Sequence, residues 1–400
     1  MTVRREAVSV SQVASAARVD VPPDTRRIAV MTLAHFVNDS YGNYIAVLLP
    51  LLITKLDFSL SAAGVLVAAY AITSSIVQPA LGYVADRLAT RVISVFGTMA
   101  AAIGASLLGL APHYVVLVML AVVSGLGTAA YHPQAAAMVV SVAGRRRATM
   151  MSLYLMGGNL GFAIGPTVAV WVVDNLGWRG MPLLAIPGLA MGVVIYVAAP
   201  RNWSPNAGTG GPSLMEVIKR NRGILGRLLA VVGVRSWGHM GLMAFLPIFL
   251  VDFKGFSERE AAVLVMALLF TGAFGGVIGG WIADSHWATR RTVIVVSLVL
   301  AGIFGLAMLE ASGVLLWLFA ILTGLTLLGS FSVLTVKGQE VLPNNVGLAS
   351  GFMLGLTIGL GGLGTLPLGF LADQIGLSPV IHFTVLLPPL AAVLALRLPE

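Results

Sequence analysis

Long apolar runs alternate with short polar breaks along almost the whole chain. Twelve such runs follow one another from residue 28 to residue 397, and each is about long enough to cross a bilayer core of ~30 Å as a helix. The pattern predicts an all-α membrane protein with twelve transmembrane helices. We expect these helices near 28–53, 62–84, 91–110, 114–142, 148–173, 181–199, 227–251, 261–283, 291–309, 314–336, 346–371 and 379–397.

The longest polar break divides the chain near its centre, and the two parts repeat each other. GYVADRLATR in the first part returns as GWIADSHWATRR in the second, so that Asp86 matches Asp284, and Gly165 matches Gly364 at nearly the same displacement. Such a duplication predicts two pseudo-symmetric six-helix bundles with a substrate site between them near the membrane midplane. The expected parts are an N-terminal tail (1–27), a first bundle (28–199), a linker (200–226) and a second bundle (227–400).

Composition and charge support a membrane protein and exclude several other classes. The chain is 58% apolar and 10% charged, whereas a soluble domain carries about 25% charged residues. If the N-terminus is cytoplasmic, 19 of the 24 Lys and Arg residues fall in cytoplasmic segments, as the positive-inside rule requires. We therefore expect a multi-pass protein of the cell inner membrane with both termini in the cytoplasm. The net charge of +8 orients the protein in the lipid bilayer and does not indicate a nucleic-acid partner.

Polar side chains interrupt the first apolar run. His35, Asn38 and Asp39 lie three and four residues apart, so they share one helix face, and Gly42 and Asn43 are expected to continue this face one turn on. A carboxylate near the bilayer centre costs at least ~2.5 kcal/mol and therefore normally faces a cavity or a partner. The pattern favours a substrate or proton site over a polar patch that only joins helices.

Two further helices carry polar groups at similar depth. The fourth run contains Tyr131, His132 and Gln134, and a lone helix histidine can be either a proton site or a packing residue. The seventh run contains Arg235, Trp237 and His239. We assign these residues of the fourth and seventh runs to the candidate substrate and proton site, together with His35, Asn38 and Asp39.

The internal repeat relates the two intramembrane charges. A displacement of 197 residues maps Asn38 onto Arg235, so Asp39 and Arg235 should lie at similar depths in the two bundles. We predict that they face the central cavity and pair in one conformational state, because two opposite charges offset much of each other's cost. A permanent structural salt bridge is the alternative.

The repeated Gly-x-x-x-Asp motif ends the second and the eighth helix. Its glycine permits close helix approach, and its aspartate lies beside arginines at a helix end, which suits either a latch or a static cap. Glu340 ends the tenth helix, where it can take part in gating or pair locally with Lys337. The candidate gating residues are Asp86, Arg87, Arg91, Asp284, Arg290 and Glu340.

These motifs resemble those of the major facilitator superfamily. Within it, HFVND, SSIVQPALGYVADR, YHPQAAA, GGNLGFAIGP, GQEVLP and GLGGLG resemble the fosmidomycin-resistance family over about residues 28–395. Gly157, Gly161, Gly165 and Pro166 partly match the antiporter motif of the superfamily, although glycines with a period of four can also serve helix packing alone.

The resemblance implies alternating access and proton-coupled export of a small drug-like or anionic compound such as fosmidomycin. Many relatives carry a glutamate where Gln134 stands, so proton coupling is not transferred to this position. An importer or an exporter of another substrate on the same scaffold remains open, as does a passive channel. An intramembrane enzyme would need a nucleophile and a base near a membrane surface, and the sequence offers no such set.

No cofactor is expected, and we expect a monomer to be the working unit. The chain has no cysteine, which excludes disulfides and Cys-based metal sites. His35, Asp39, His132 and His239 have suitable chemistry for a metal, but nothing in the sequence fixes their mutual geometry, so no metal site is predicted.

Overall fold

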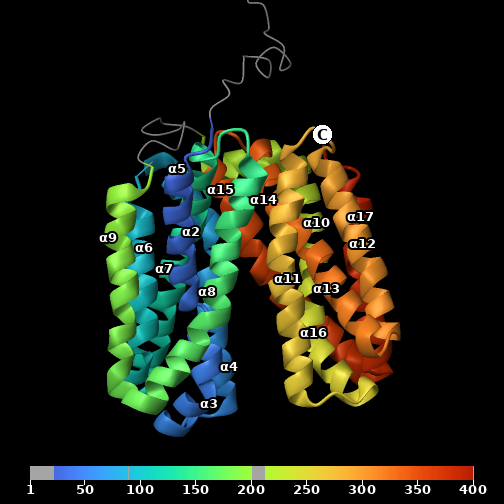
Figure 1. Cartoon of the computed structure of the whole chain (residues 1–400). Helices are drawn as coiled ribbons and strands as arrows, with labels where there is room; N and C mark the ends of the chain where they lie inside the picture. Colours follow the sequence, from blue (N-terminus) through green and yellow to red (C-terminus); the bar gives the residue numbers. More distant parts are fainter. Residues whose placement is uncertain (1–21, 89, 201–211, 400) are drawn as a thin grey trace, which may run out of the picture.

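The computed structural model describes residues 22–88, 90–200 and 212–399. Most of the expected N-terminal tail and the middle of the expected linker lie outside these residues. Within them the chain is helical, and eleven helices are long and apolar enough to cross a membrane. Figure 1 shows two bundles of helices side by side, one from each half of the chain.

The first bundle contains six spans, two of which are interrupted. Its helices are α2 (Thr25–Ser40), α3 (Tyr44–Leu56), α4 (Leu60–Ala71), the π-helix η1 (Ile72–Ile76), α5 (Gln78–Leu88), α6 (Val92–Leu107), α7 (Tyr114–Val142), α8 (Arg147–Leu176) and α9 (Ala185–Ala198).

The second bundle also contains six spans, and its fourth and fifth spans are the interrupted ones. Its helices are α10 (Leu214–Lys254), α11 (Glu258–Asp284), α12 (Arg290–Glu310), α13 (Gly313–Gly329), α14 (Phe331–Val341), α15 (Val346–Ser350), the π-helix η4 (Gly351–Gly355), α16 (Leu356–Ile375) and α17 (Leu377–Ala395). The segment 214–226, expected to belong to the linker, is the beginning of the 41-residue helix α10.

The first span is not the continuous helix that the apolar run predicted. A turn over residues 41–43 separates α2 from α3, and the two helices together cross the bundle (Figure 1). Gly42 and Asn43 are poor helix formers, and the amide of Gly42 bonds the carbonyl of Asp39 at 3.0 Å to close the turn. Asp39 therefore lies in the last turn of α2, where backbone carbonyls lack the hydrogen-bond partners of a continuous helix.

The glycines of α8 allow it to approach α2 closely. A Cβ atom at Gly157, Gly161 or Gly165 would lie 2.0–2.3 Å from carbonyl oxygens of α2, one turn apart along that helix. Only glycine fits such backbone contacts, so this stripe fixes the position of α2 and of the polar residues it carries.

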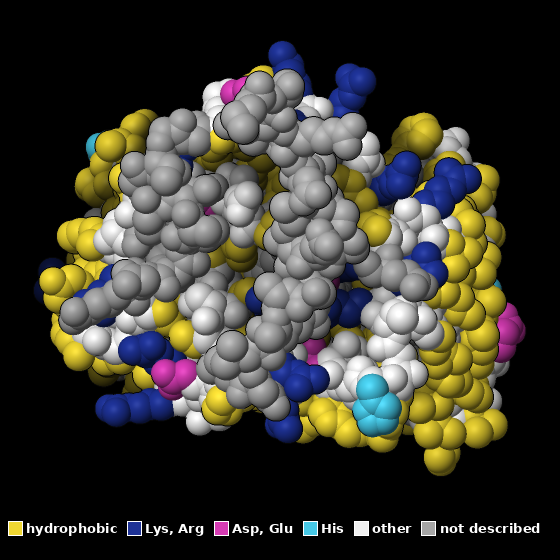
Figure 2. All heavy atoms as spheres, turned by 90° about the horizontal axis from the view of Figure 1, so that it is seen from above, with side chains coloured by type: hydrophobic (Ala, Val, Ile, Leu, Met, Phe, Trp, Pro, Cys, Tyr) yellow, Lys and Arg dark blue, Asp and Glu magenta, His cyan; other side chains and the backbone are white. Residues whose placement is uncertain are grey.

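The two bundles meet near the face where α2 begins and α17 ends, which we call the terminal face. Their ribbons diverge toward the other face (Figure 1). Gly82 of α5 packs on the backbone of Gly347, and Gly351 packs on the backbone of Gln78, where any Cβ atom would overlap with the partner helix. Seen from the terminal face, Lys and Arg side chains are spread over the surface, while apolar side chains cover the flank of the second bundle (Figure 2).

Candidate functional site

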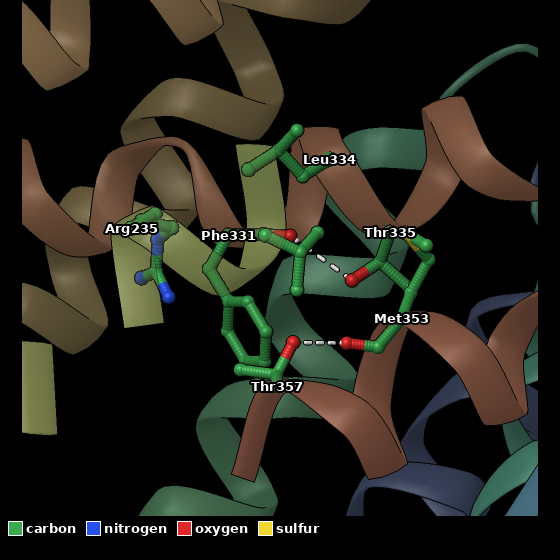
Figure 3. Close-up of a pocket in the computed structure, with 7 residues that line it drawn as sticks. Arg235, Phe331, Leu334, Thr335, Met353 and Thr357 are labelled. Carbon is green, nitrogen blue, oxygen red and sulfur yellow. Dashed lines mark hydrogen bonds between the residues drawn. The ribbon is translucent and has the colours of Figure 1, made fainter. Parts of the chain in front are cut away.

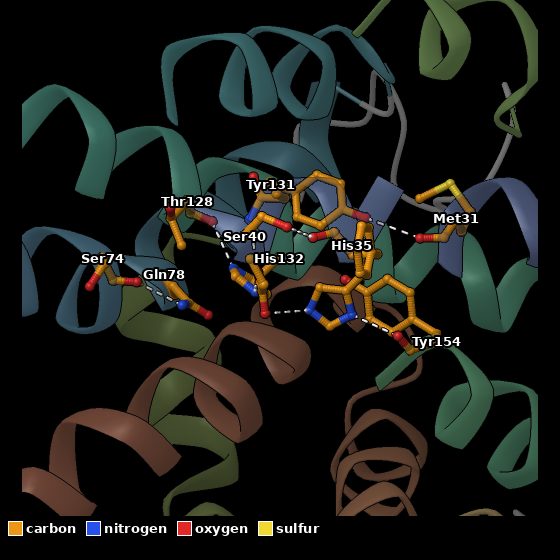
Figure 4. Close-up of polar contacts among 12 residues, drawn as sticks. Met31, His35, Ser40, Ser74, Gln78, Thr128, Tyr131, His132 and Tyr154 are labelled. Carbon is orange, nitrogen blue, oxygen red and sulfur yellow. Dashed lines mark hydrogen bonds and ion pairs between the residues drawn. The ribbon is translucent and has the colours of Figure 1, made fainter. Parts of the chain in front are cut away.

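Asp39 is held between two histidines inside the first bundle. Its Oδ2 lies 3.1 Å from Nε2 of His35, one turn earlier on α2, and its Oδ1 lies 3.0 Å from Nε2 of His132 on α7. Both histidine side chains are buried, whereas the Asp39 side chain keeps 18% of its surface exposed. We call His35, Asp39 and His132 the triad, and Figure 4 labels its two histidines.

Backbone carbonyls fix the tautomer of both histidines. Nδ1 of His35 lies 2.8 Å from the carbonyl oxygen of Tyr154, and Nδ1 of His132 lies 2.8 Å from that of Thr128. A carbonyl oxygen can only accept a hydrogen bond, so each Nδ1 carries a proton. Each Nε2 then donates to Asp39 only as an imidazolium, or accepts from Asp39 when the carboxyl group is protonated.

This geometry leaves two positions for protons in the triad, one between each Nε2 and its carboxylate oxygen. With both filled, the triad has a net charge of +1 wherever the protons reside. When one proton leaves, a nitrogen lone pair faces an oxygen lone pair and one hydrogen bond is lost. The triad can therefore exchange a proton and change its internal contacts as a result.

The same three groups offer the donor atoms that a zinc-like metal accepts, and these atoms lie within 4.8 Å of one another. Each Nε2 is in direct contact with a carboxylate oxygen, at the distance of a charge-assisted hydrogen bond. Protons thus account for the observed arrangement, and we do not assign a metal to it.

Two residues that complete this site were missed in the sequence. The ring of Tyr154 stacks on His35 with centroids 4.0 Å apart. A Cβ atom at Gly158 would lie 2.5 Å from Nε2 of His35 and 2.8 Å from Oδ2 of Asp39. The sequence signal was the pair Gly157-Gly158, in which the second glycine falls outside the period-four stripe and makes room for the triad.

Of the other predicted site residues on α2 and α7, two lie beside the triad and one does not. Asn38 donates from Nδ2 to Oδ1 of Asp39 at 3.0 Å, and the hydroxyl of Tyr131 donates to the carbonyl of Met31 at 3.2 Å. Gln134 instead ties α7 to the start of α6, because its Oε1 accepts from the amide of Ser94 and its Nε2 donates to a backbone carbonyl.

Arg235 forms a second charged site, inside the other bundle. Its Nη2 donates to the carbonyl of Leu327 at 3.1 Å, its Nε donates to Oγ of Ser330 at 3.4 Å, and the guanidinium lies 5.0 Å from the Phe331 ring centroid. The break between α13 and α14 at Ser330 supplies these acceptors, because the last carbonyls of a helix lack intrahelical partners. Among the described residues no carboxylate lies within 4 Å of Arg235.

A narrow crevice adjoins Arg235, and in this conformation it is too tight to hold a water molecule. Phe331, Thr335, Met353 and Thr357 line it, so its wall is largely apolar (Figure 3). His239 lies one turn along α10, and its buried Nε2 has no hydrogen-bond partner among the described residues. Trp237 packs on Gly364 of α16, where it joins two helices of the same bundle.

The structure does not bring Asp39 and Arg235 together. In this conformation, Asp39 is bonded to histidines of its own bundle, and Arg235 is bonded to a carbonyl and a hydroxyl of its own bundle. The expected pairing in another conformational state stays a prediction.

The motif aspartates cap helices of the opposite bundle at the terminal face. Asp86 accepts from the amides of Gly347 and Leu348, at 2.8 and 2.9 Å, at the start of α15. Asp284 accepts from the amides of Ala148 and Thr149, at 3.1 and 2.8 Å, at the start of α8. A carboxylate at a helix N-terminus satisfies free amides and interacts favourably with the helix dipole.

The remaining candidate gating residues have separate contacts. Arg290 bridges two carboxylates: its Nη2 lies 3.3 Å from Oδ1 of Asp284, and its Nη1 lies 2.5 Å from Oε1 of Glu340. Glu340 therefore pairs with an arginine of α12 in addition to any local contact. Arg91 donates to the carbonyl of Ala199 at 3.2 Å, and Arg87 donates to the carbonyl of Pro212. Arg290 thus extends a network from the cap that Asp284 makes.

Comparison with known proteins shows the class to which these features belong. The family model of the Major Facilitator Superfamily matches residues 31–365. The fosmidomycin resistance protein of Escherichia coli is 28% identical over 381 residues, which cover 93% of this chain and 92% of that protein. The solved fucose:proton symporter of E. coli has a TM-score of 0.77 at 15% identity, covering 92% of this chain and 96% of the other. For the human organic anion transporter MFSD10 the TM-score is 0.76 at 16% identity, covering 94% and 100%.

The chain is therefore a multi-pass membrane transporter and not an enzyme. It belongs to the Major Facilitator Superfamily.

Proposed function

We propose that the protein exports a small anionic compound across the cell inner membrane in exchange for protons. The surroundings of Arg235 are the observation that supports an anionic substrate. The buried guanidinium of this residue has no carboxylate within 4 Å among the described residues. A buried charge is costly unless it is paired. An anionic substrate that enters beside α10 and α14 would provide the missing charge. A phosphonate such as fosmidomycin would provide this negative charge. One relative of the chain is named a fosmidomycin resistance protein.

The triad supplies the proton side of the proposal. It has two proton positions, and the partly exposed Asp39 gives solvent access to them. Loss of the proton between Asp39 and His132 breaks the hydrogen bond that joins α2 to α7, so protonation and the position of α2 are linked. We place proton exchange at Asp39 with His35 and His132, and anion binding at Arg235.

The distribution of charge supports an orientation of the protein in the membrane. If the arginine-rich terminal face is cytoplasmic, as the positive-inside rule favours, the present conformation is closed toward the cytoplasm by the two aspartate caps. Alternating access then requires these caps to open when substrate is taken up from the cytoplasm. One chain contains both charged sites, and we propose that a monomer completes the cycle.

Flux measurements in proteoliposomes test this function. With substrate outside and an acidic interior, vesicles whose terminal face points outward should accumulate fosmidomycin, and collapse of the pH gradient should abolish the accumulation. Arg235→Gln should remove uptake of the anion, whereas Arg222→Gln, at an exposed position of the same helix, should leave it unchanged. Movement of substrate and protons in the same direction would instead indicate symport. Equal transport by Arg235→Gln would contradict the anion site.

A further inference from the structure

A basic pocket opens at the terminal end of the second bundle, away from both charged sites described above. Its volume is about 660 Å³, and it lies between the ends of α10, α12, α14 and α17. Four cationic side chains line it, namely Arg227, Arg291, Lys337 and Arg397. Glu340 is the one carboxylate among its described lining residues, and Arg290 already pairs with it at 2.5 Å.

The four cations are a feature of the second bundle and not of the repeated fold. The equivalent residues of the first bundle are Val30, at the displacement of 197 that relates α10 to α2, and Val92, Met138 and Ala198, at the displacement of 199 found farther along the repeat. All four are apolar, although that end of the first bundle lies at the same face of the membrane. The general excess of positive charge at this face therefore does not explain why four cations converge on one pocket.

Two of the arginines also organise the end of the chain. Arg227 donates to the carbonyl of Arg397 at 3.4 Å, and Arg291 donates to the carbonyl of Leu398 at 3.4 Å. A guanidinium has five N–H groups, so Arg227 retains donors for a ligand after this bond. Lys337 is 5% exposed, which places a strongly hydrated ammonium group in a wall with little access to water.

An apolar stripe leads from the membrane to this pocket. On α17 and just beyond it, Leu390, Val393 and Leu396 are 49%, 60% and 56% exposed, and their spacing of three residues keeps them on one side of the helix. Leu396 itself lines the pocket. An acyl chain can lie along this stripe while its headgroup reaches the cations.

We propose that the pocket binds the phosphate-bearing headgroup of an anionic membrane lipid. A phosphate diester provides an acceptor group that guanidinium and ammonium groups share, and basic pockets between helices at the cytoplasmic side are typical sites for such headgroups. The bound lipid joins α10, α12, α14 and α17 at the end of the bundle that carries the cap contact of Asp284. The site requires neither transport nor substrate.

Binding to the full chain, purified in a neutral detergent, tests the proposal. Native mass spectrometry should show one tightly retained phosphatidylglycerol, and dioctanoyl phosphatidylglycerol should raise the melting temperature while dioctanoyl phosphatidylcholine does not. The double variant Arg227→Gln/Arg397→Gln should weaken this binding by about 25-fold, because each cation near a headgroup contributes about 1 kcal/mol, or about 5-fold. Arg222→Gln on the same helix is the matched control.

Three results would overturn the proposal. One is equal retention of phosphatidylglycerol by the double variant and the control. Another is stabilisation by inorganic phosphate at the same concentration as the lipid, which would assign the pocket to a soluble phosphate compound. The third is equal stabilisation by the two lipids, which would show that the headgroup charge is not recognised. If the double variant unfolds, Lys337→Met with the same lipids takes its place.

Discussion

Asp86 and Asp284 make the same contact in opposite directions across the interface between the bundles. Each lies at the end of a transmembrane helix of its own bundle and accepts hydrogen bonds from the amides of the second and third residues of a helix in the other bundle. The two aspartates are 198 residues apart, and the amides that they bind are 199 apart. The duplicated motif thus closes the terminal face through two equivalent caps, which must break together when this face opens.

Removal of either cap should favour conformations in which the terminal face is open. A side-chain cap contributes about 1 kcal/mol, so Asp86→Ala or Asp284→Ala should shift the equilibrium by about 5-fold, and the double variant by more. The chain has no cysteine, so spin labels can be placed at Ser141→Cys and His286→Cys without other changes. Pulsed electron resonance should show longer distances between these labels in the variants.

The control for this experiment is Asp373→Ala, an exposed carboxylate at the other end of the second bundle. Its distance distribution should match that of the parent protein. Unchanged distances in the double cap variant would show that the caps do not contribute to closure.

Gly158→Ala should damage transport without unfolding the protein. The added methyl group would lie 2.5 Å from the His35 ring and 2.8 Å from the Asp39 carboxylate, so the triad must change its geometry. We expect at least a ~10-fold loss of proton-driven flux, because charge-assisted contacts depend strongly on distance. Gly362→Ala, where the new Cβ meets open space, is the matched control. Similar flux from both variants would argue against a role for the triad geometry.

The triad also predicts how stability depends on pH. With both bridging protons present, one charge-assisted hydrogen bond joins His132 of α7 to Asp39 of α2, and the other joins His35 to Asp39 within α2. As pH rises and a proton leaves, one of these bonds is lost. The melting temperature should therefore fall with increasing pH as the triad loses this proton. His132→Gln keeps a donor near Asp39 but cannot titrate, so its melting temperature should depend less on pH. The same slope in His132→Gln and in the surface variant His286→Gln would contradict this assignment.

The sequence predicted the architecture because repeated apolar runs and a duplicated motif are long-range patterns. Twelve runs indicated twelve membrane spans, and the equivalence of Asp86 with Asp284 was visible from their flanking residues. The polar face formed by His35 and Asp39 followed from helical spacing alone. These predictions depend on the spacing of residues along the chain, and that spacing can be read from a single sequence.

The partners of the polar groups could not be predicted in the same way. Similar depth for Asp39 and Arg235 does not determine where each side chain points, and each found partners in its own bundle. The helix breaks after Ser40 and at Ser330 were also missed. Gly42 and Asn43 carried a signal for the first break, but the long apolar run favoured one continuous helix. Gln134 was assigned to the substrate site, but it joins α7 to the start of α6. Its spacing from His132 in the sequence does not reveal that α6 begins beside it.

The final prediction concerns Arg235 and separates charge from geometry. Arg235→Lys keeps the positive charge, but an ammonium group cannot hold Leu327 and Ser330 and also present a planar fork to an anion. We expect Arg235→Lys to raise KM for a phosphonate by about 10-fold with a smaller change in kcat, and Arg235→Gln to abolish saturable transport, since a hydrogen bond to a charged group contributes about 1.5–3 kcal/mol. Initial rates of proton-driven flux over a range of substrate concentrations measure both effects. His239→Gln, one turn away on α10, should change KM much less. If Arg235→Gln also loses transport of a neutral analogue that the parent transports, the guanidinium serves the fold of the second bundle rather than the anion.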